Sequence, residues 1–278
     1  MTQKVALVTG ASSGIGEDSA RQLHRAGFIV YGAARRTDRM KDLASSGVRT
    51  LSLDVTDEAS AEKAVAEIIA AEGRIDVLVN NAGYGSYGAL EDVPLDEADA
   101  QLEVNLFGLA RMTQLVLPHM RAQHSGTIVN ISSMGGRFAT PMGAWYHASK
   151  YAVEGLSDAL RLEVKQFGIN VVIIEPGSIR TPWGSIAADK LSATSGHGPY
   201  AAQAAAMGKS LEQSSQPNAR MTSPPSVIGK AVTKAATARH PRTRYQVGFG
   251  SRPLIFLSKI LPDRVFDALI KRSSGVPN

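Results

Sequence analysis

The stretch TGASSGIG at residues 9–16 decides the fold. It follows an apolar run, residues 5–8, that is typical of a buried strand ending in a turn. It precedes residues 15–25, whose spacing of apolar side chains is typical of a helix. Glycines at such a turn let backbone N–H groups approach a pyrophosphate, and the helix N-terminus adds partial positive charge. The spacing is G-x-x-x-G-x-G, and its position after the first strand predicts a dinucleotide-binding turn.

Strand and helix patterns alternate along most of the chain. We expect strands at residues 5–8, 28–31, 51–53, 77–79, 127–131, 170–174 and 245–247, and helices at residues 15–25, 59–71, 102–119 and 148–166. Repeated strand-then-helix units predict an α/β fold of the Rossmann type, with a doubly wound parallel sheet covered by helices on both faces. Because α/β folds of 278 residues are often single, we expect one domain over residues 1–278.

Two segments depart from this alternation. Residues 183–222 are rich in small and polar residues with little periodicity, which predicts an irregular substrate lid. Residues 253–272 form an amphipathic basic C-terminal extension, and Pro262 divides it into two expected short helices.

The composition excludes some kinds of chemistry. The chain has no cysteine, so disulfides, thiol catalysis and zinc–thiolate sites are excluded. The formal net charge is +5, but residues 220–278 carry 11 Lys and Arg against 2 Asp and Glu, a local net charge of +9. This basic end either meets an acidic lipid, a phosphate-bearing substrate or another subunit, or is a solvated surface.

Targeting and membrane patterns are absent from the sequence as given. The first residues lack the apolar core and cleavage site of a signal peptide, and no run of 18 apolar residues occurs. We expect a cytoplasmic protein with no transmembrane span and no nucleic-acid partner.

The residues after the second expected strand bear on the choice of cofactor. Sites for NAD place a carboxylate there for the ribose 2′-hydroxyl, but this chain has Arg35 and Arg36. Guanidinium groups suit a 2′-phosphate, and the hydroxyls of Ser12 and Ser13 could add donors. The sequence therefore favours NADP(H) over NAD(H). The alternative is that the arginines only solvate a strand end; Asp38 lies one turn too late to select the cofactor.

Tyr146 and Lys150 are four residues apart and share one face of an expected helix. A free phenol has a pKa of about 10, and a nearby ammonium lowers it. Alone, such a pair is often an ordinary surface pair. Here Ser133 lies thirteen residues earlier, and Asn105 and the NNAG stretch at 80–83 also fall near the carboxyl ends of expected strands. Ligands bind at that edge of open α/β sheets.

Neighbouring residues offer alternative interpretations. Ser132 could replace Ser133, but the thirteen-residue spacing favours Ser133. His147 points away from the Tyr146–Lys150 face and is interpreted as structural. The histidines show no H-x-x-x-H pattern, so we expect no catalytic metal. The sequence around Ser133 also lacks the G-x-S-x-G elbow of a hydrolase nucleophile.

These motifs together resemble the short-chain dehydrogenase/reductase family in its single-domain branch. The matching motifs are TGASSGIG at 9–16, LDVTD at 53–57, NNAG at 80–83, Asn105, Ser133, YHASK at 146–150 and PG at 176–177. They have the order and spacing of the family over residues 4–182. The sequences VYGAARR and YHASKYAVEGLSDALRLE are similar to the NADP-using members that include 17β-hydroxysteroid and retinol dehydrogenases.

The resemblance implies a role for each matching residue. It makes Tyr146 the general acid or base, Ser133 a hydrogen-bond partner of the substrate oxygen, and Asn105 the holder of a water that links Lys150 to solvent. Lys150 would bind the nicotinamide ribose and lower the pKa of Tyr146. Asp54 and Val55 would meet the adenine, and Asn81 would lie on the adenosine side. The expected cofactor-binding residues are Gly10, Ser12, Ser13, Gly14, Ile15, Gly16, Arg35, Arg36, Asp54, Val55, Asn81, Ala82, Gly83, Tyr146, Lys150, Pro176, Gly177, Ile179 and Thr181.

The expected activity is the interconversion of a carbonyl and a primary or secondary alcohol on a lipophilic substrate, with NADP(H). The candidate pocket side chains are Tyr84, Tyr87, Met134, Phe138, Met142, Trp145, Trp183, Ile186, Leu191, Tyr200, Met207 and Leu211. Alternatives are an NAD(H)-preferring dehydrogenase and a non-catalytic dinucleotide-sensing regulatory protein, although a sensor need not keep a proton relay.

The resemblance also implies a homodimer or homotetramer built on the helices at 102–119 and 148–166. For residues 253–272 we expect core packing or an oligomer contact. Closure over the pocket and peripheral membrane contact remain open for this segment.

Overall fold

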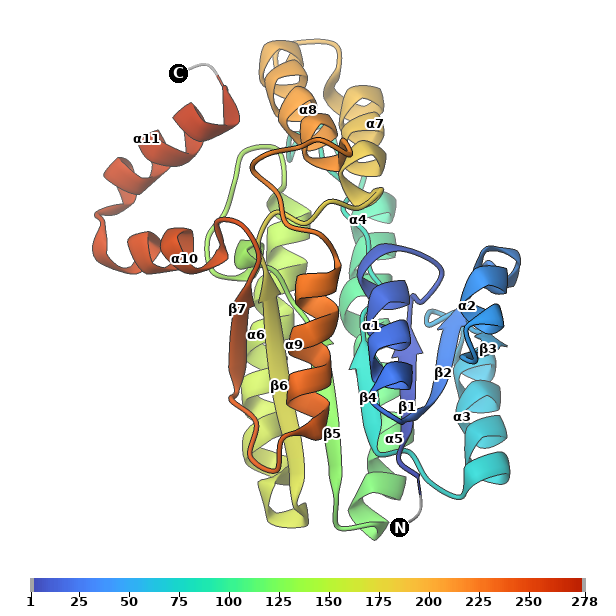
Figure 1. Cartoon of the computed structure of the whole chain (residues 1–278). Helices are drawn as coiled ribbons and strands as arrows, with labels where there is room; N and C mark the ends of the chain where they lie inside the picture. Colours follow the sequence, from blue (N-terminus) through green and yellow to red (C-terminus); the bar gives the residue numbers. More distant parts are fainter. Residues whose placement is uncertain (1–2, 277–278) are drawn as a thin grey trace.

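The computed structural model describes residues 3–276 as a parallel sheet with helices on both faces (Figure 1). The strands are β1 (Val5–Thr9), β2 (Ile29–Ala34), β3 (Arg49–Ser52), β4 (Val77–Asn80), β5 (Gly126–Ile131), β6 (Ile169–Pro176) and β7 (Arg244–Val247). They form one seven-stranded sheet in the order β3-β2-β1-β4-β5-β6-β7, and every pair is parallel. The predicted doubly wound fold is confirmed.

The strand order changes direction between β1 and β4. The chain first builds outward from β1 to β3, and then continues on the other side of β1 with β4. In a parallel sheet such a reversal opens a crevice at the carboxyl ends of the strands, where ligands bind. The loops after β1 and β4 carry TGASSGIG and NNAG, so both predicted cofactor motifs lie at this crevice.

Helices cover the two faces of the sheet and bury alternate residues of each strand. The helices are α1 (Gly14–Arg25), α2 (Lys41–Ser45), α3 (Glu58–Glu72), α4 (Leu95–Leu102), α5 (Gly108–Ala122), α6 (Ala144–Val164), α7 (Trp183–Ser195), α8 (Ala201–Ser215), α9 (Ser226–Thr237), α10 (Ser251–Ile260) and α11 (Asp263–Ser274). Ala6 and Val8 of β1 pack in a core with α1 and α9. Val5 and Leu7 pack in the opposite core with α3, α5 and α6.

The helix expected over residues 102–119 is part of a longer helical run. It consists of α4, a π-helical turn at Glu103–Phe107, and α5. The π turn contains Asn105, which is buried. Such turns are inserted into α-helices mostly at functional sites, because the extra residue redirects side chains.

The prediction that residues 183–222 are irregular is wrong, because most of this segment forms the antiparallel pair α7 and α8 (Figure 1). Their buried faces are made of Ala187 and Leu191 on α7, and Ala204, Met207 and Leu211 on α8. These residues are spaced by three or four, but most of the remaining positions hold alanine and serine, which hide the contrast that a helical pattern needs. Helix α9 was likewise not expected from the sequence.

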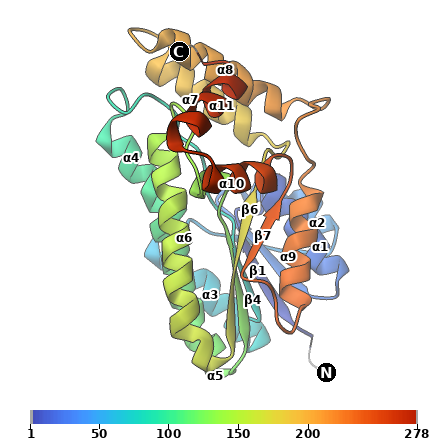
Figure 2. The same ribbon diagram turned by 90° about the vertical axis from the view of Figure 1, so that its left-hand side faces the viewer.

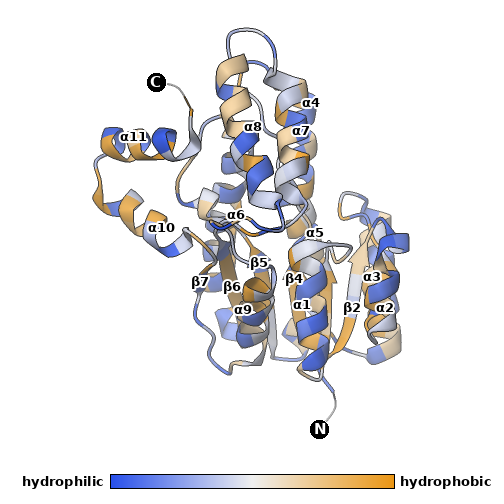
Figure 3. Cartoon of the chain, turned by 45° about the horizontal axis from the view of Figure 1, so that its top comes forward, coloured by the Kyte–Doolittle hydropathy of each residue, from blue (hydrophilic) through white to orange (hydrophobic). Residues whose placement is uncertain are grey.

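The C-terminal extension forms two helices, α10 and α11, and Pro262 lies between them as predicted. Their inner side chains Ile255, Phe266 and Ile270 pack on Phe138, so the expected core packing is present. Both helices lie at the carboxyl end of the sheet, where α10 contacts β7 and α11 contacts α8 (Figure 2). Apolar and polar residues alternate along them (Figure 3). Among residues 3–276, no helix combines the length and apolarity needed to cross a bilayer.

Candidate active site

The turn between β1 and α1 can be built only with glycine at three positions. Gly10 and Gly14 have φ angles of 67° and 58°, in the left-handed region that side chains other than glycine rarely adopt. A Cβ on Gly16 would lie 2.3 Å from the Gly10 carbonyl oxygen. Residues 12–15, at the start of the helix, are only half-buried, so their backbone remains accessible. This geometry fits the binding of a pyrophosphate at a helix N-terminus.

The NNAG stretch holds this turn in place. The Asn81 side chain donates to the Thr9 and Gly10 carbonyls at 3.0 and 3.2 Å. The backbone N–H groups of Asn81 and Ala82 donate to the Thr9 hydroxyl at 3.0 and 3.1 Å. Thr9 begins the TGASSGIG motif but was not among the expected site residues. Only the contact with the loop after β4, distant in sequence, shows its role.

The end of β2 presents two exposed guanidinium groups. The Arg35 side chain is 71% exposed, and its nearest carboxylate is Asp54 at 3.8 Å. Arg36 is also exposed. Strand β2 pairs directly with β1, so these arginines follow the strand beside the glycine turn. A glycine turn with two unburied cations beside it fits a dinucleotide that carries an additional phosphate.

The two residues expected at the adenine have different environments. The Asp54 carboxylate accepts hydrogen bonds from the backbone and hydroxyl of Thr56. Val55 is buried, and its side chain limits the space beside Gly108 at the start of α5. The Val55 carbonyl accepts a hydrogen bond from Arg111 at 2.6 Å. The side chain and carbonyl of Val55 therefore already have partners within the protein.

Tyr146 and Ser133 come together beneath α7 and α8, the helices of the segment that was expected to be a substrate lid. Ser133 follows β5 and caps a short 3₁₀ turn, where its hydroxyl accepts a hydrogen bond from the Gly135 N–H at 3.0 Å. Tyr146 lies in the first turn of α6 and is only 8% exposed. Burial raises the pKa of the Tyr146 phenol to about 12, although a hydrogen bond with Ser133 acts to lower it.

Lys150 is buried one turn further along α6. Its ammonium donates to the Ile131 carbonyl at the end of β5, at 3.0 Å. Burial lowers the pKa of Lys150 to about 8, and the charge of Glu154 acts in the opposite direction. The resemblance implied that Lys150 lowers the Tyr146 pKa. In the structure, burial of the phenol has the largest effect on the Tyr146 pKa, and it raises that pKa. The hydrogen bond of Lys150 goes to the Ile131 carbonyl of β5.

Asn105 lies next to Lys150 at the π turn. A Cβ on Gly83 would be 3.0 Å from the Asn105 Oδ1 and 3.8 Å from the Lys150 Nζ, so both polar atoms face the same small space. Asn105 accepts from the Tyr84 N–H and donates to the Tyr84 carbonyl, both at 2.9 Å, and to the Ser149 hydroxyl at 3.1 Å. These contacts with the Tyr84 backbone and the Ser149 hydroxyl were not predicted, because no sequence pattern marks them.

His147 is structural, as expected from the sequence. Its Nδ1 donates to the Gly135 carbonyl at 2.9 Å, and its Nε2 accepts from the Thr140 N–H at 2.9 Å. These bonds fix the loop that carries Ser133. Ser132 faces the opposite way, toward Glu154; burial raises the pKa of this carboxyl, and the nearby Ser132 hydroxyl acts to lower it. Of the two serines, Ser133 is therefore the one that faces Tyr146.

An aromatic cluster surrounds the phenol. The ring centroids of Tyr87 and Trp183 lie 5.6 and 5.2 Å from that of Tyr146. The same apolar cluster contains the expected pocket residues Met142, Leu191, Tyr200, Met207 and Leu211, together with Val276 near the C-terminus. Tyr146 therefore lies under a continuous apolar cover.

Other expected pocket residues lie elsewhere. Phe138 and Met134 pack in the α10–α11 cluster, where the Phe138 and Phe266 rings are 5.3 Å apart, and Ile186 is exposed. Trp145 is half-buried. The Lys190 ammonium of α7 lies over the Tyr84 ring, 4.8 Å from the ring centroid. Tyr84 therefore contacts α7 through a cation–π interaction.

The segment after β6 passes over the glycine turn. A Cβ on Gly14 would lie 3.1 Å from the Thr181 methyl group, and the Thr181 carbonyl accepts a hydrogen bond from Ser215 of the lid. A Cβ on Gly177 would be 2.0 Å from the Phe249 carbonyl oxygen. Ile179 pairs with Ser223. The structure thus brings the residues expected on the nicotinamide side next to the expected phosphate turn.

The sequence and the structure are similar to those of known oxidoreductases. Residues 4–190 match the family model described as short chain dehydrogenase. The chain is 38% identical over 273 residues to the 3-ketodihydrosphingosine reductase of Bacteroides thetaiotaomicron, covering 98% of each chain. It is 34% identical to the NADPH-dependent 3-dehydrocapnine reductase of Ornithobacterium rhinotracheale, covering 96% of this chain and 95% of that one. The crystal structure of a short-chain dehydrogenase from Streptomyces avermitilis superposes with a TM-score of 0.81 at 34% identity over the full length of both chains.

Proposed function

This chain belongs to the short-chain dehydrogenase family, and on that premise we propose that it interconverts a ketone and an alcohol on a lipophilic substrate with NADP(H). The observation that carries the proposal is the meeting of Ser133 and Tyr146 beneath an apolar lid. The Ser133–Tyr146 hydrogen bond and the aromatic cover define a dry site with two hydroxyl groups for one oxygen atom. The segment through Thr181 joins this site to the glycine turn.

In this proposal each residue handles charge or a proton on the substrate oxygen. NADPH, when bound, supplies the hydride for reduction. The Tyr146 phenol holds a proton at neutral pH and donates it to the oxygen as negative charge develops there. The Ser133 hydroxyl donates a hydrogen bond to the same oxygen. The lid excludes water, which strengthens both interactions.

Lys150 and Asn105 help Tyr146 to give up its proton and to regain one. The Lys150 ammonium stabilises negative charge on the phenolate that proton transfer leaves behind. Its pKa of about 8 allows it to release or take up a proton near neutral pH. Asn105, fixed by its bonds to Tyr84, places its Oδ1 close to this ammonium. We propose that a water held there returns a proton from solvent.

The preference for NADP(H) rests on Arg35 and Arg36. Both guanidinium groups are exposed at the end of β2, where a 2′-phosphate would lie. The name of the Ornithobacterium relative includes NADPH dependence, which supports the same choice. The rival interpretations are an NAD(H)-preferring dehydrogenase, which does not need these cations, and a dinucleotide sensor, which does not need Ser133 and Tyr146.

The proposed substrate is a ketone on a long apolar chain. The names of two relatives place the oxidised carbon at position 3 of the substrate, and one of these substrates is a sphingosine derivative. The lid of this chain presents aromatic and aliphatic side chains toward Tyr146. The test is NADPH and NADH oxidation with a panel of 3-ketodihydrosphingosine, a steroid ketone and a short water-soluble ketone. Turnover restricted to the short ketone would contradict a lipophilic substrate.

For assembly we propose a homodimer or homotetramer through α5 and α6. Phe107 at the π turn, and Tyr151 and Leu162 on α6, are exposed in the single chain. Large apolar side chains at exposed positions of these helices support their burial against a second copy.

For α10 and α11 we propose peripheral contact with an anionic membrane. Phe256 is 61% exposed, and Ile260 and Val265 are also exposed, while Lys259 and Arg264 lie among them. A second copy would bring like charges together, whereas acidic lipid complements them.

A further inference from the structure

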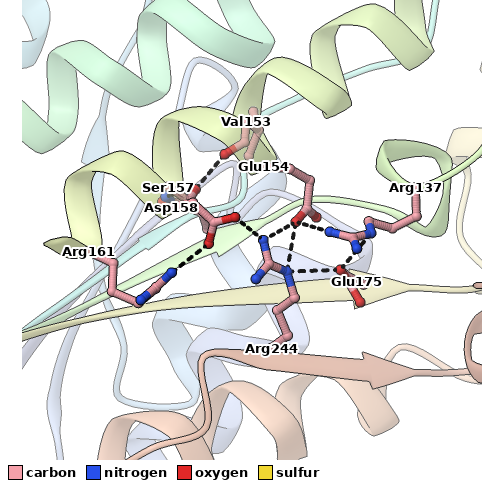
Figure 4. A network of polar contacts seen from close by, with 9 residues as sticks. Arg137, Val153, Glu154, Ser157, Asp158, Arg161, Glu175 and Arg244 are labelled. Atoms are coloured by element: carbon pink, nitrogen blue, oxygen red, sulfur yellow. Dashed lines mark hydrogen bonds and ion pairs between the residues drawn. The ribbon is translucent and has the colours of Figure 1, made fainter.

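A cluster of charged side chains joins α6, β6, β7 and the segment after β5 (Figure 4). We call the set Arg137, Glu154, Asp158, Arg161, Glu175 and Arg244 the buried ion cluster. Arg244 is at its centre: its guanidinium lies 3.0 Å from the Glu154 carboxylate, 2.6 Å from that of Asp158 and 3.3 Å from that of Glu175. Arg137 lies 3.6 Å from Glu154 and 3.8 Å from Glu175.

Two members of this cluster, Glu154 and Glu175, are buried to a degree that is unusual for ionised side chains. Glu175 is fully buried, and neither of its carboxylate oxygens has a hydrogen-bond partner within residues 3–276. It is therefore held by the charges of Arg137 and Arg244. Removing carboxylates from water is costly, and well-packed apolar residues would often stabilise a protein equally well. The cluster therefore calls for an explanation other than stability alone.

The members come from four segments, three of which also carry expected active-site residues. Arg137 follows Ser133 by four residues, Glu154 follows Lys150 by one turn of α6, and Glu175 directly precedes Pro176-Gly177. The fourth segment is β7, which supplies Arg244.

Two of these segments, the Ser133 loop and α6, meet closely at Gly136. A Cβ there would lie 2.8 Å from the Ser132 hydroxyl, 2.9 Å from the Lys150 carbonyl and 3.1 Å from the Glu154 Cγ. The Ser133 loop and the Lys150 turn are thus packed without space between them. Any shift in Glu154 would be transmitted to both.

We propose that the buried ion cluster is a positioning device, which fixes the Ser133 loop, the Tyr146–Lys150 helix and the Pro176–Gly177 segment relative to one another. Glu154, Glu175 and Arg244 are positioning residues, because they act through these segments. Arg244 brings the last strand of the sheet into this role. The inference rests on the proposed function only for its kinetic readout.

The cluster also places negative charge behind Lys150. The Lys150 ammonium donates to the Ile131 carbonyl of β5 and lies in the same small space as the Asn105 amide of the π turn, and Tyr146 and Glu154 lie one helical turn before and after it on α6. Of these, the Glu154 carboxylate is the one that supports the protonated lysine, since its charge raises the Lys150 pKa against the effect of burial. The loss of this charge would let the lysine deprotonate at lower pH.

The test compares Arg244→Met and Glu154→Gln in the full chain with Arg49→Met as the matched control. Arg49→Met also removes an arginine paired with a carboxylate, Glu72, but between β3 and α3, far from the cluster. We expect Arg244→Met to lower kcat by about tenfold or more, as small misplacements of reacting groups do. The NADPH Kd should change less than threefold, and Arg244→Lys should restore part of kcat.

Two further readouts separate positioning from general stability. In Glu154→Gln, the alkaline limb of the plot of kcat against pH should move to lower pH, by about half a pH unit or more. In Arg244→Met, amide hydrogen exchange over residues 133–137 and 176–181 should become faster, while Arg49→Met leaves it unchanged. The exchange experiment needs no turnover, so it decides the inference even if no substrate is found.

The inference would be overturned if folded Arg244→Met and Glu154→Gln matched the control in kcat, pH profile and hydrogen exchange. If Arg244→Met does not fold, the nearly isosteric Glu154→Gln decides alone. An unchanged alkaline limb and unchanged exchange at 133–137 in that variant would contradict the positioning role. Absence of turnover in the wild type would contradict the proposed function. Faster hydrogen exchange in the variants would still support the positioning role of the buried ion cluster.

Discussion

The indole ring of Trp183 and the phenol ring of Tyr146 lie 5.2 Å apart, so a lid side chain covers the residue that we propose as the proton donor. Trp183 also packs tightly on the backbone of the loop after β4, because a Cβ on Gly85 would be 2.4 Å from its ring. The lid and the cofactor crevice are therefore joined by one aromatic side chain.

Truncating this side chain should weaken substrate binding more than catalysis. We expect Trp183→Ala to raise KM for a long-chain ketone about tenfold, since it removes a large apolar surface beside the reacting oxygen. Ile186→Ala, on the exposed face of the same helix, is the control and should leave KM unchanged. Steady-state kinetics with both variants checks this, and equal KM values would contradict a substrate site beneath α7.

Removing the hydroxyl of Tyr146 should abolish turnover and leave NADPH binding intact. Tyr146→Phe keeps the ring in the aromatic cluster but removes the donated proton, a loss of about 10²- to 10⁴-fold in kcat. Tyr151→Phe removes a hydroxyl from an exposed position of the same helix and serves as the control. NADPH fluorescence titration and turnover should be measured together. A Tyr146→Phe protein with ordinary kcat would refute the assigned role.

Cofactor preference should reverse when the cations at the end of β2 are replaced. Arg35→Asp combined with Arg36→Ala removes two charge-assisted partners of a 2′-phosphate, and each such bond contributes about 1.5–3 kcal/mol. The ratio of kcat/KM for NADPH to that for NADH should fall at least about thirtyfold. Arg39→Ala, a nearby exposed arginine, should leave the ratio unchanged. An unaltered preference in the double variant would defeat the NADP(H) assignment.

Lys150 should destabilise the fold at neutral pH. Burial holds its folded pKa at about 8, against 10.5 when unfolded, so between pH 8 and 10.5 the unfolded chain keeps a proton that the folded chain has released. The cost is complete below pH 8, diminishes as the pH rises from 8 to 10.5, and is absent above that range. Lys150→Met should therefore raise Tm by several degrees at pH 7, and by less at pH 10, while turnover is lost. A lower Tm at pH 7 would show that the hydrogen bond to Ile131 outweighs desolvation.

The outer surface of α10 should mediate binding to acidic vesicles. Sedimentation with phosphatidylglycerol vesicles is expected to carry down the wild type, and phosphatidylcholine vesicles are expected to carry down much less. The variant Phe256→Glu with Ile260→Glu should lose this binding by placing negative charge on the exposed apolar positions. Leu95→Glu, at an exposed leucine on α4, is the matched control. Vesicle binding that survives the α10 substitutions would assign these helices to another contact.

Much of the sheet was predictable from the sequence because several parallel strands contain continuous apolar runs, such as residues 5–8 in β1, 77–79 in β4 and 171–174 in β6. The lid helices were not, since Ala187 and Ala204 bury little surface and contrast weakly with their alanine and serine neighbours. Propensity alone does not distinguish such a segment from a loop.

The site was predictable where a motif fixes it and not where long-range contacts do. The convergence of Ser133 and Tyr146 followed from their spacing. Thr9, Glu154 and Arg244 had no pattern in the sequence, because each acts on a partner from a distant segment. The direction of the Lys150 ammonium toward Ile131 likewise depends on how α6 docks on β5.

Val276 packs in the same apolar cluster as Tyr146, although 130 residues separate them in the sequence. The tail of the chain is therefore part of the wall around the reacting group. Exchange of this tail between related enzymes could alter which molecules they accept while the proton-transfer residues stay the same. For the same reason, affinity tags for kinetic work belong at the amino end of the chain.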